Sequence, residues 1–525
     1  MGKQTIRAFT LTLFPLFLIF YVCAPPKNEI VAKPNSRTYT AAIDEKTREV
    51  LNIFEQISAI PRCSKREKKM SKWLVNWAQK HGFKVSADKI GNVVIKVPAT
   101  NGYETAPKVV FQGHMDMVCD KIPESNHDFR KDPIRIIYDG DWLKADNTTL
   151  GADNGLGMAL CLALAIDKTV NHPPLEILFT VQEESGLIGA KSLDPGFVEG
   201  KILLNIDSEE EGVFTIGSAG GILTLTYLPV TTHTPAKDQT VYRLRIDGLQ
   251  GGHSGMDINK KRGNANKILA RTLEALKTSS QISLISVKGG TKANAIPREA
   301  EAILACDPTQ FLNLKKLIAP LEQTLRGEFA HTATSPSIHF SQMKPKDFPG
   351  SLFIQQDTDK VINLLLALPD GVAEMSADIE ERVETSNNIG IVGLKNTALF
   401  VISLQRGAKK SKLREFSKKI EAIASQCGGK TKKLDEFPAW EPNTRSWLLK
   451  RCKIVYGKVF EKEPRVTIVH GGLECSVIGS KFDDMDMISL GPTIKDAHSP
   501  DEKVYIPSID RVWRFLAAFL ASYGN

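Results

Sequence analysis

The chain has 525 residues, of which 42% are hydrophobic and 24% charged, and its formal net charge at pH 7 is +8. This length is too great for one ordinary core, so two domains are expected, and the composition excludes a disordered or fibrous protein. The 68 lysines and arginines are scattered among 60 acidic residues, so a nucleic-acid-binding surface is not favoured.

The N-terminus is predicted to be an export signal. Basic residues precede an apolar stretch, residues 8–22, which ends at Cys23. A positive flank before an apolar run is typical of a signal peptide, and this run is short for a spanning helix. Residues 1–24 are therefore interpreted as a signal peptide or membrane anchor, either lipidated at Cys23 or uncleaved, and residues 25–42 as a linker. We expect an exported protein, membrane-associated or periplasmic.

The cysteines do not indicate a disulfide framework. There are 8 of them, and none forms a CxxC pair. In an exported protein some of these thiols could still form a disulfide, because export compartments are oxidising. The sequence does not indicate which of them would pair.

Helical and strand-like patterns alternate over the first part of the body. Apolar residues recur at helical spacing in residues 48–60, 66–81 and 155–166, and apolar runs occupy residues 91–97, 108–112, 175–181 and 201–206. This alternation predicts an α/β domain whose mixed sheet is flanked by helices on both faces.

The pattern changes between residues 220 and 431. Strand-like pieces surround helical ones here, the former at residues 222–227, 241–246, 282–287 and 300–305 and the latter at residues 263–277, 310–327 and 411–426. A final α/β portion follows, with apolar runs at residues 465–469 and 487–490. We therefore expect one α/β domain, built from residues 43–219 and 432–525, which an inserted α+β domain interrupts at residues 220–431.

Histidines and carboxylates stand at the ends of predicted strands or in neighbouring loops. Side chains two apart in a strand point the same way, so Asp116 can lie beside His114 and orient its ring. Each residue alone has an ordinary structural explanation: a buried hydrogen-bonded histidine, a helix N-cap at Asp153, or a solvated acidic turn. Together they form a set that could bind metal and move a proton: His114, Asp116, Asp153, Glu183, Glu184, Asp207 and His498.

The charges of this set suit a pair of divalent ions. Asp153, Glu184 and Asp207 supply three negative charges, and a bridging hydroxide would supply a fourth, against four positive charges. Imidazole and carboxylate ligands favour Zn²⁺, with Mn²⁺ or Co²⁺ as alternatives. Two such ions, about 3.5–4 Å apart, would polarise a carbonyl and make hydroxide available near neutral pH. These residues therefore point to metal-dependent hydrolysis.

A series of motifs resembles the bacterial aminoacyl-histidine dipeptidases, a family also called cytosol non-specific dipeptidase or peptidase D. The similarity runs in order from about residue 45 to the end of the chain. The motifs are GHMDMV (113–118), HDFRKDP (127–133), TTLGADNGLGMA (148–159), QEESG (182–186), NIDSEEEG (205–212), GGHSG (251–255), GNANK (263–267), NAIPRE (294–299), HGGLEC (470–475) and GPTIKDAHSPDE (491–502).

The resemblance implies a dipeptidase with two metal ions, acting on dipeptides that include Xaa-His. Asp153 would bridge the two ions. His114 and Asp207 would complete one metal site, and Glu184 and His498 would complete the other.

The same resemblance implies roles for further residues. Glu183 would take a proton from the attacking water and pass it to the leaving amine, while Asp116 orients a metal-binding histidine. His253 would stabilise the oxyanion. Asn294 and Arg406 would hold the backbone or the carboxylate of the substrate, and an arginine suits a carboxylate because its fork donates two parallel bonds.

The resemblance also implies a division of labour between the domains and a partner. The α/β domain would be catalytic, and the inserted domain would be a lid that closes over the site and, in many relatives, forms a homodimer. The relatives are typically cytosolic, so a cytoplasmic location is the alternative to export. Two other functions are open: a related N-acyl amino acid amidohydrolase, and a catalytically silent peptide-binding protein. The silent protein is disfavoured because every predicted ligand and the base are present.

Overall fold

The computed structural model describes residues 43–235, 240–332, 334–344, 350–377 and 382–524, which all belong to one compact unit, residues 39–525. Within these residues, no helix combines the length and the apolar character that a membrane crossing requires. The predicted signal peptide or anchor, with Cys23, and the predicted linker lie outside the described residues.

A mixed eight-stranded sheet forms the first part of the fold. Its strands lie in the order β1 (Lys84–Ala87), β2 (Val93–Val97), β6 (Leu175–Thr180), β3 (Val109–His114), β7 (Ile202–Asn205), β23 (Asp486–Ser489), β8 (Val213–Ser218) and β22 (Arg465–Val469). β3 runs parallel to β6 and β7, whereas β2 is antiparallel to β6. All residues of β3, β6 and β7 are buried, as expected for parallel strands that are covered on both faces.

Helices cover both faces of this sheet. One core contains residues from α1 (Glu45–Ser58), α2 (Lys68–Lys80), α3 (Ala152–Ile166), α9 (Trp447–Phe460) and α11 (Ile506–Ala521). A second core contains residues from α4 (Ile188–Ser192) and α10 (Glu474–Lys481). Phe111 of β3 belongs to the first core and its neighbour Val110 to the second, because successive side chains of a strand point to opposite faces. The predicted α/β sheet with helices on both faces is confirmed.

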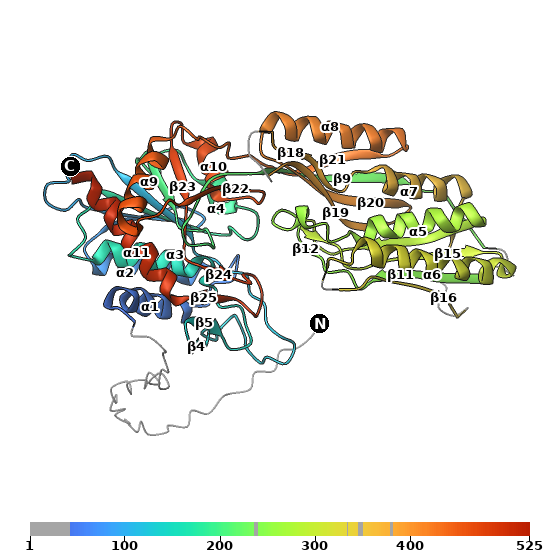
Figure 1. The fold of residues 1–525 in the computed structure, drawn as a ribbon, viewed down its shortest axis with the longest axis horizontal. Helices are drawn as coiled ribbons and strands as arrows, with labels where there is room; N and C mark the ends of the chain where they lie inside the picture. The colour runs from blue at the N-terminus through green and yellow to red at the C-terminus, as the bar shows by residue number, and fades with distance from the viewer. Residues whose placement is uncertain (1–42, 236–239, 333, 345–349, 378–381, 525) are drawn as a thin grey trace, which may run out of the picture. The chain divides into compact units, whose positions relative to one another are not determined.

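The two ends of the described chain meet in this domain. α1, near the start, contacts α11, near the end, and Figure 1 shows the blue and red helices side by side. α1 begins after Asp44, whose carboxylate accepts a hydrogen bond from the Thr47 N–H at 2.9 Å. Such an N-cap satisfies one of the backbone donors that a helix leaves free at its start.

A second, nine-stranded sheet is built entirely from residues between β8 and β22 of the first. Its strands are β9 (Gly220–Pro229), β11 (Thr240–Asp247), β13 (Ile282–Gly289), β15 (Ala300–Cys306), β16 (Ser337–Gln342), β18 (Gly371–Met375), β19 (Val383–Lys395), β20 (Ala398–Gly407) and β21 (Lys430–Phe437). Four helices share one core with this sheet: α5 (Ala265–Ser279), α6 (Phe311–Glu328), α7 (Gln355–Ala367) and α8 (Lys410–Gln426). The prediction of an inserted α+β unit is confirmed.

Smaller strand pairings place loops that matter for the site. β24 (Ile494–Lys495) and β25 (Lys503–Tyr505) join β5 (Trp142–Ala145) and β4 (Ile136–Asp139) in a four-stranded sheet. In the inserted unit, β12 (Gly252–His253) pairs with β14 (Ala295–Ile296), and β10 (Thr232–His233) pairs with β17 (Leu352–Phe353).

One disulfide is present in the described part of the chain. It joins Cys63 to Cys119, with a Cα–Cα distance of 5.7 Å, inside the usual range for disulfides. The other described cysteines are free thiols. A single disulfide is not a disulfide framework. The sequence did not indicate that Cys63 and Cys119 would pair.

Candidate metal centre

The candidate site lies at the carboxyl edge of the first sheet. His114 is the last residue of β3, and Asp207 follows β7. The turn that contains Glu183 and Glu184 follows β6. Because these strands are parallel, their carboxyl ends meet at one edge, where α/β proteins commonly bind ligands. Asp153 joins this edge from the first turn of α3.

Asp153 stands between two histidines. Its Oδ1 lies 2.9 Å from His114 Nε2, and its Oδ2 lies 3.0 Å from His498 Nε2, in the loop between β24 and β25. Asp207 Oδ1 lies 3.4 Å from His114 Nε2. Glu184 Oε1 lies 2.8 Å from His498 Nε2. The structure thus brings all the predicted metal ligands into one cluster, with each oxygen of Asp153 facing a different histidine.

The cluster fits a metal site. Ligand atoms of His114, Asp153 and Glu184 all lie within 4.8 Å of one another. Glu184 Oε1 and Asp207 Oδ1 are buried and make no hydrogen bond, although each lies close to a histidine nitrogen. These contacts are short but lack hydrogen-bond geometry, and buried oxygens are rarely left without a partner. Divalent cations held by imidazole and carboxylate groups would satisfy both atoms.

The electrostatics of the cluster shift the pKa values of its own ligand groups. Burial acts to lower the pKa of His114, but the charge of Asp207 and hydrogen bonds to two further carboxylates raise it well above its ordinary value. Burial raises the pKa of Asp207 to about 6, against the opposing charge of His114. Metal ligands must lose their protons when a cation binds, so metal affinity is expected to weaken as the pH falls.

Asp116 connects His114 to the acidic turn after β6. Its Oδ1 lies 3.4 Å from His114 Nδ1. Its carboxylate accepts hydrogen bonds from the N–H groups of Glu183 at 3.0 Å and Glu184 at 3.3 Å, and from Ser64 Oγ at 2.8 Å. A carboxylate on the outer nitrogen of a metal-binding histidine fixes the tautomer and orientation of the ring. The position of Asp116 therefore suits the orienting role that was predicted for it.

Glu183 lies beside the cluster, and its pKa is shifted. Burial raises its pKa well above the ordinary value, and the charges of Glu184 and Asp207 raise it further, while His114 opposes the shift. A nearby cation would lower this pKa again. A carboxyl group whose pKa is brought close to the working pH can both accept and return a proton.

The loop before α3 is held by Glu502, a buried carboxylate with no predicted role. It accepts hydrogen bonds from the backbone N–H groups of residues 150–153, at 2.8, 2.9, 2.8 and 3.2 Å. The last of these donors belongs to Asp153 itself, whose peptide bond to Asn154 is cis. Glu502 therefore positions the backbone of the carboxylate that stands between the two histidines.

Arg62 is a second buried charge with no predicted role. It donates to the carbonyl oxygens of Met115 at 3.3 Å and Asp116 at 2.9 Å, and also to that of Gly151. Burial lowers its pKa to about 10, while nearby carboxylates act to raise it. Gly151 has a φ of 69°, and a Cβ there would lie 2.7 Å from Arg62 Nη2. Only glycine permits this close approach without displacement.

His253, in the inserted unit, has its ring oriented so that Nε2 can donate a hydrogen bond. Its Nδ1 accepts hydrogen bonds from the N–H groups of Gly255 at 3.3 Å and Met256 at 3.1 Å. Burial, reinforced by the positive charges of Arg406 and His498, lowers its pKa to about 3. The ring is therefore neutral at pH 7, and because Nδ1 accepts, the proton is assigned to Nε2.

Arg406 lies in β20 and has no carboxylate partner among the described residues. Its side chain is buried, and its Nε and Nη1 make no hydrogen bond. Ser386 lies opposite Arg406 on the paired strand β19. Its hydroxyl lies 2.8 Å from Nε2 of His470, which follows β22. Burial, reinforced by Arg406 and His253, lowers the pKa of His470 to about 3. Buried guanidinium donors without partners indicate a place for an anionic ligand group.

Asn294 is linked by a backbone hydrogen bond to Ser254, which directly follows His253. Its carbonyl accepts a hydrogen bond from the Ser254 N–H at 2.8 Å, at the end of the β12–β14 pairing. The side chain of Asn294 is exposed. The structure therefore brings Asn294 close to the histidine predicted to stabilise the oxyanion.

Comparison with known proteins assigns the chain to a family. It is 38% identical to the cytosol non-specific dipeptidase of Escherichia coli (strain K12) over 469 residues, which cover 89% of this chain and 96% of that protein. The chain belongs to this family, the bacterial aminoacyl-histidine dipeptidases.

Solved structures agree with the family. The aminoacylhistidine dipeptidase from Vibrio alginolyticus is 36% identical, with a TM-score of 0.76, and the match covers 90% of this chain and 96% of that one. An aminopeptidase from Bacillus cereus shares the fold at 16% identity, with a TM-score of 0.51 over 91% of this chain and 99% of that one. Residues 244–333 match the peptidase dimerisation domain of M20 peptidases, so in this family member the inserted unit contains a known module.

Proposed function

We propose that the chain is a metal-dependent dipeptidase that hydrolyses the peptide bond of dipeptides, Xaa-His among them. The central observation is the position of Asp153 between His114 and His498, with Glu184 and Asp207 beside them. Membership of a dipeptidase family supports the reaction type. A catalytically silent peptide-binding protein is disfavoured because every proposed ligand and the proposed base are present.

The contacts of the cluster support an assignment of the metal ligands. His114 and Asp207 would hold one ion, Glu184 and His498 the other, and Asp153 would lie between them. The two divalent ions would be Zn²⁺ as the best match, with Mn²⁺ or Co²⁺ as alternatives. They would supply Lewis acidity and lower the pKa of a water molecule, so that hydroxide is available to attack.

Glu183 would move the proton. It is left out of the ligand cluster, its side chain is half-buried, and its pKa is raised well above the ordinary value. It would take a proton from the attacking water and give it to the nitrogen of the leaving amine. The Nε2–H of His253 would donate to the carbonyl oxygen as negative charge develops there.

Arg406 would select the free carboxylate of the substrate. Its buried Nε and Nη1 lack partners, and an arginine binds a carboxylate through parallel hydrogen bonds. Asn294 would hold the substrate backbone beside His253. Recognition of a carboxylate near the scissile bond favours a dipeptide over a longer peptide.

The test is a substrate panel with the purified, metal-analysed full chain. We expect about two metal equivalents and hydrolysis of free dipeptides, including Xaa-His. A dipeptide with an amidated C-terminus is expected to react about tenfold more slowly or worse, because a hydrogen bond to a charged group is lost. Metal binding without cleavage of any dipeptide would show that the chain is not an enzyme of this type. Cleavage of N-acyl amino acids instead would favour an amidohydrolase.

A homodimer and an exported location complete the proposal. The match of residues 244–333 to a dimerisation domain supports the dimer.

The relative from Escherichia coli is cytosolic by its name, but two observations favour export of this chain. One is the apolar stretch of residues 8–22 after a basic flank. The other is the Cys63–Cys119 disulfide, since stable disulfides belong to oxidising compartments. Cell fractionation should find the protein in the membrane or periplasm, with membrane attachment if Cys23 is lipidated. Full-length protein confined to the soluble cytoplasm would refute export.

A further inference from the structure

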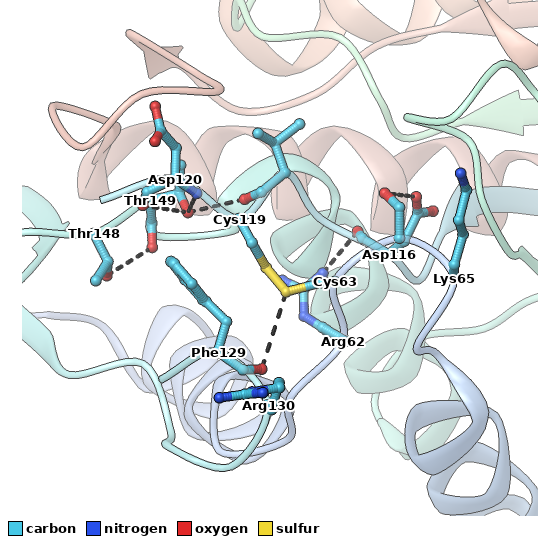
Figure 2. Close-up of a disulfide and its surroundings, with 12 residues drawn as sticks. Arg62, Cys63, Lys65, Asp116, Cys119, Asp120, Phe129, Arg130, Thr148 and Thr149 are labelled. Atoms are coloured by element: carbon cyan, nitrogen blue, oxygen red, sulfur yellow. Dashed lines mark hydrogen bonds between the residues drawn. A yellow bond between two sulfur atoms is a disulfide. The ribbon is translucent and has the colours of Figure 1, made fainter. Parts of the chain in front are cut away.

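The Cys63–Cys119 disulfide lies next to the machinery that positions the metal ligands. Cys63 directly follows Arg62, and Cys119 comes three residues after Asp116 on the loop that follows β3. Figure 2 shows the disulfide with Arg62 and Asp116 close to it. None of the roles proposed above uses this bond.

The segment around Cys63 makes several hydrogen bonds with the segment around Asp116. Arg62 donates to the carbonyl of Asp116 at 2.9 Å, and the carbonyl of Arg62 accepts from the Met117 N–H at 3.2 Å. Ser64, on the other side of Cys63, donates to Asp116 Oδ2 at 2.8 Å. Every one of these contacts joins the two segments that the disulfide crosslinks.

The crosslinked loop also contacts the segment that leads to Asp153. The Thr149 N–H donates to the carbonyl of Asp120 at 2.9 Å, and Figure 2 shows both residues beside Cys119. The Thr149 hydroxyl donates to the carbonyl of Val118 at 2.9 Å. Arg62 reaches the same segment through the carbonyl of Gly151. Hydrogen bonds therefore connect both crosslinked segments to the segment that leads to Asp153.

The two cysteines of the disulfide are partly exposed. Cys63 and Cys119 are both half-buried, whereas four of the free thiols in the described chain, Cys161, Cys306, Cys452 and Cys475, are buried and the remaining one, Cys427, is half-buried. Thiol–disulfide exchange requires access of an attacking thiolate to one sulfur. A dithiol reductant can therefore reach this bond more readily than it can reach the core.

We propose that the Cys63–Cys119 disulfide is a redox-sensitive clamp that positions the metal ligands, an inference that rests on the proposed metal centre. A dithiol reductant attacks one sulfur and then closes its own disulfide. It supplies the two electrons and two protons that convert Cys63 and Cys119 to free thiols. In the reduced chain only hydrogen bonds join the Arg62 segment to the Cys119 loop, so Asp116, and through it His114, is held less firmly. Metal affinity then falls, because groups that orient metal ligands set about 10- to 100-fold of it.

The experiment compares metal affinity in the full chain with the disulfide intact and broken. Zn²⁺ affinity is measured by competition with a chromophoric chelator, for wild type before and after reduction and for the C63S/C119S double variant. The reductant is removed before each titration because thiolates bind Zn²⁺, and the double variant receives the same treatment as a control for any direct effect of the reductant. Cys427→Ser, at a half-buried free thiol, is the matched control. Thiol labelling with mass spectrometry confirms the state of the bond.

The clamp predicts that reduced wild type and the double variant bind Zn²⁺ about 10- to 100-fold more weakly. The reductant should not change the double variant, and Cys427→Ser should match oxidised wild type. Excess metal should restore kcat with KM little changed, because the substrate-binding residues lie elsewhere. The inference is overturned if breaking the bond leaves Zn²⁺ affinity unchanged while oxidised protein binds metal and cleaves dipeptides. Oxidised protein that binds no metal would overturn both the clamp and the metal centre.

Discussion

Glu183→Gln is expected to keep its metal ions and lose about 10³-fold or more in kcat. The variant replaces a carboxyl group that stands outside the ligand cluster with an amide of the same shape. An amide cannot take up or release a proton near neutral pH, and general acid–base catalysis contributes about 10²–10⁴-fold in enzymes. A loss of about 10³-fold corresponds to about 4 kcal/mol in the activation free energy. Metal content by mass spectrometry and steady-state kinetics on a dipeptide check both parts.

The control for this variant is Glu210→Gln. Glu210 is an exposed carboxylate in the turn after Asp207, where it pairs with Arg465 at the surface. Exposed ion pairs contribute little to stability, so this change should leave metal content and kcat within about twofold of wild type. If Glu183→Gln instead loses metal to the same extent as a ligand variant, Glu183 is a ligand and the base has been assigned wrongly.

The fold could be predicted where the hydrophobic pattern is regular. The buried runs that became β3, β6 and β7 and the amphipathic pattern of α1 are evident in the sequence. The pattern of α11 was equally clear, with Ile509, Val512 and Leu516 on its buried face, but this helix was not predicted. β19 was hidden for a physical reason, since its buried positions include Asn387 and Asn388, which bond to backbone carbonyls of other loops. Burial of polar side chains removes the apolar signal on which strand prediction depends.

The candidate site could be predicted only in part. Residues at the ends of strands were identifiable because parallel strands bring their carboxyl ends together. The residues that hold those ends in place were not, because Arg62 and Glu502 bind backbone groups and no residue spacing records such contacts. Glu502 left a weak signal, an acidic residue four positions after His498 within the same motif. His470 was likewise part of a recognised motif, but its contact with Ser386 depends on how the two sheets are connected.

Asp153→Asn is expected to lose both metal and activity, with the largest effect of any single substitution. Each carboxylate oxygen of Asp153 faces a different histidine, at 2.9 and 3.0 Å. An amide offers one oxygen and one NH₂ group, so only one side of the site would keep a ligand and the other would meet a donor. The negative charge that balances two divalent ions is also reduced. We expect less than one metal equivalent after dialysis, against about two for wild type, and no measurable turnover.

Asp501→Asn is the matched control, because Asp501 is an exposed carboxylate in the loop that carries His498. It should retain metal and turnover, which would show that the loss in Asp153→Asn is not a general response to the removal of one negative charge near the site. The two variants at Glu183 and Asp153 are most informative together. If Glu183→Gln retains metal and Asp153→Asn loses it, then Glu183 carries the proton and Asp153 is the ligand that lies between the two ions. Full metal occupancy in Asp153→Asn would mean that the cations are held without a carboxylate between them, and the arrangement derived from the contacts of Asp153 would then be wrong.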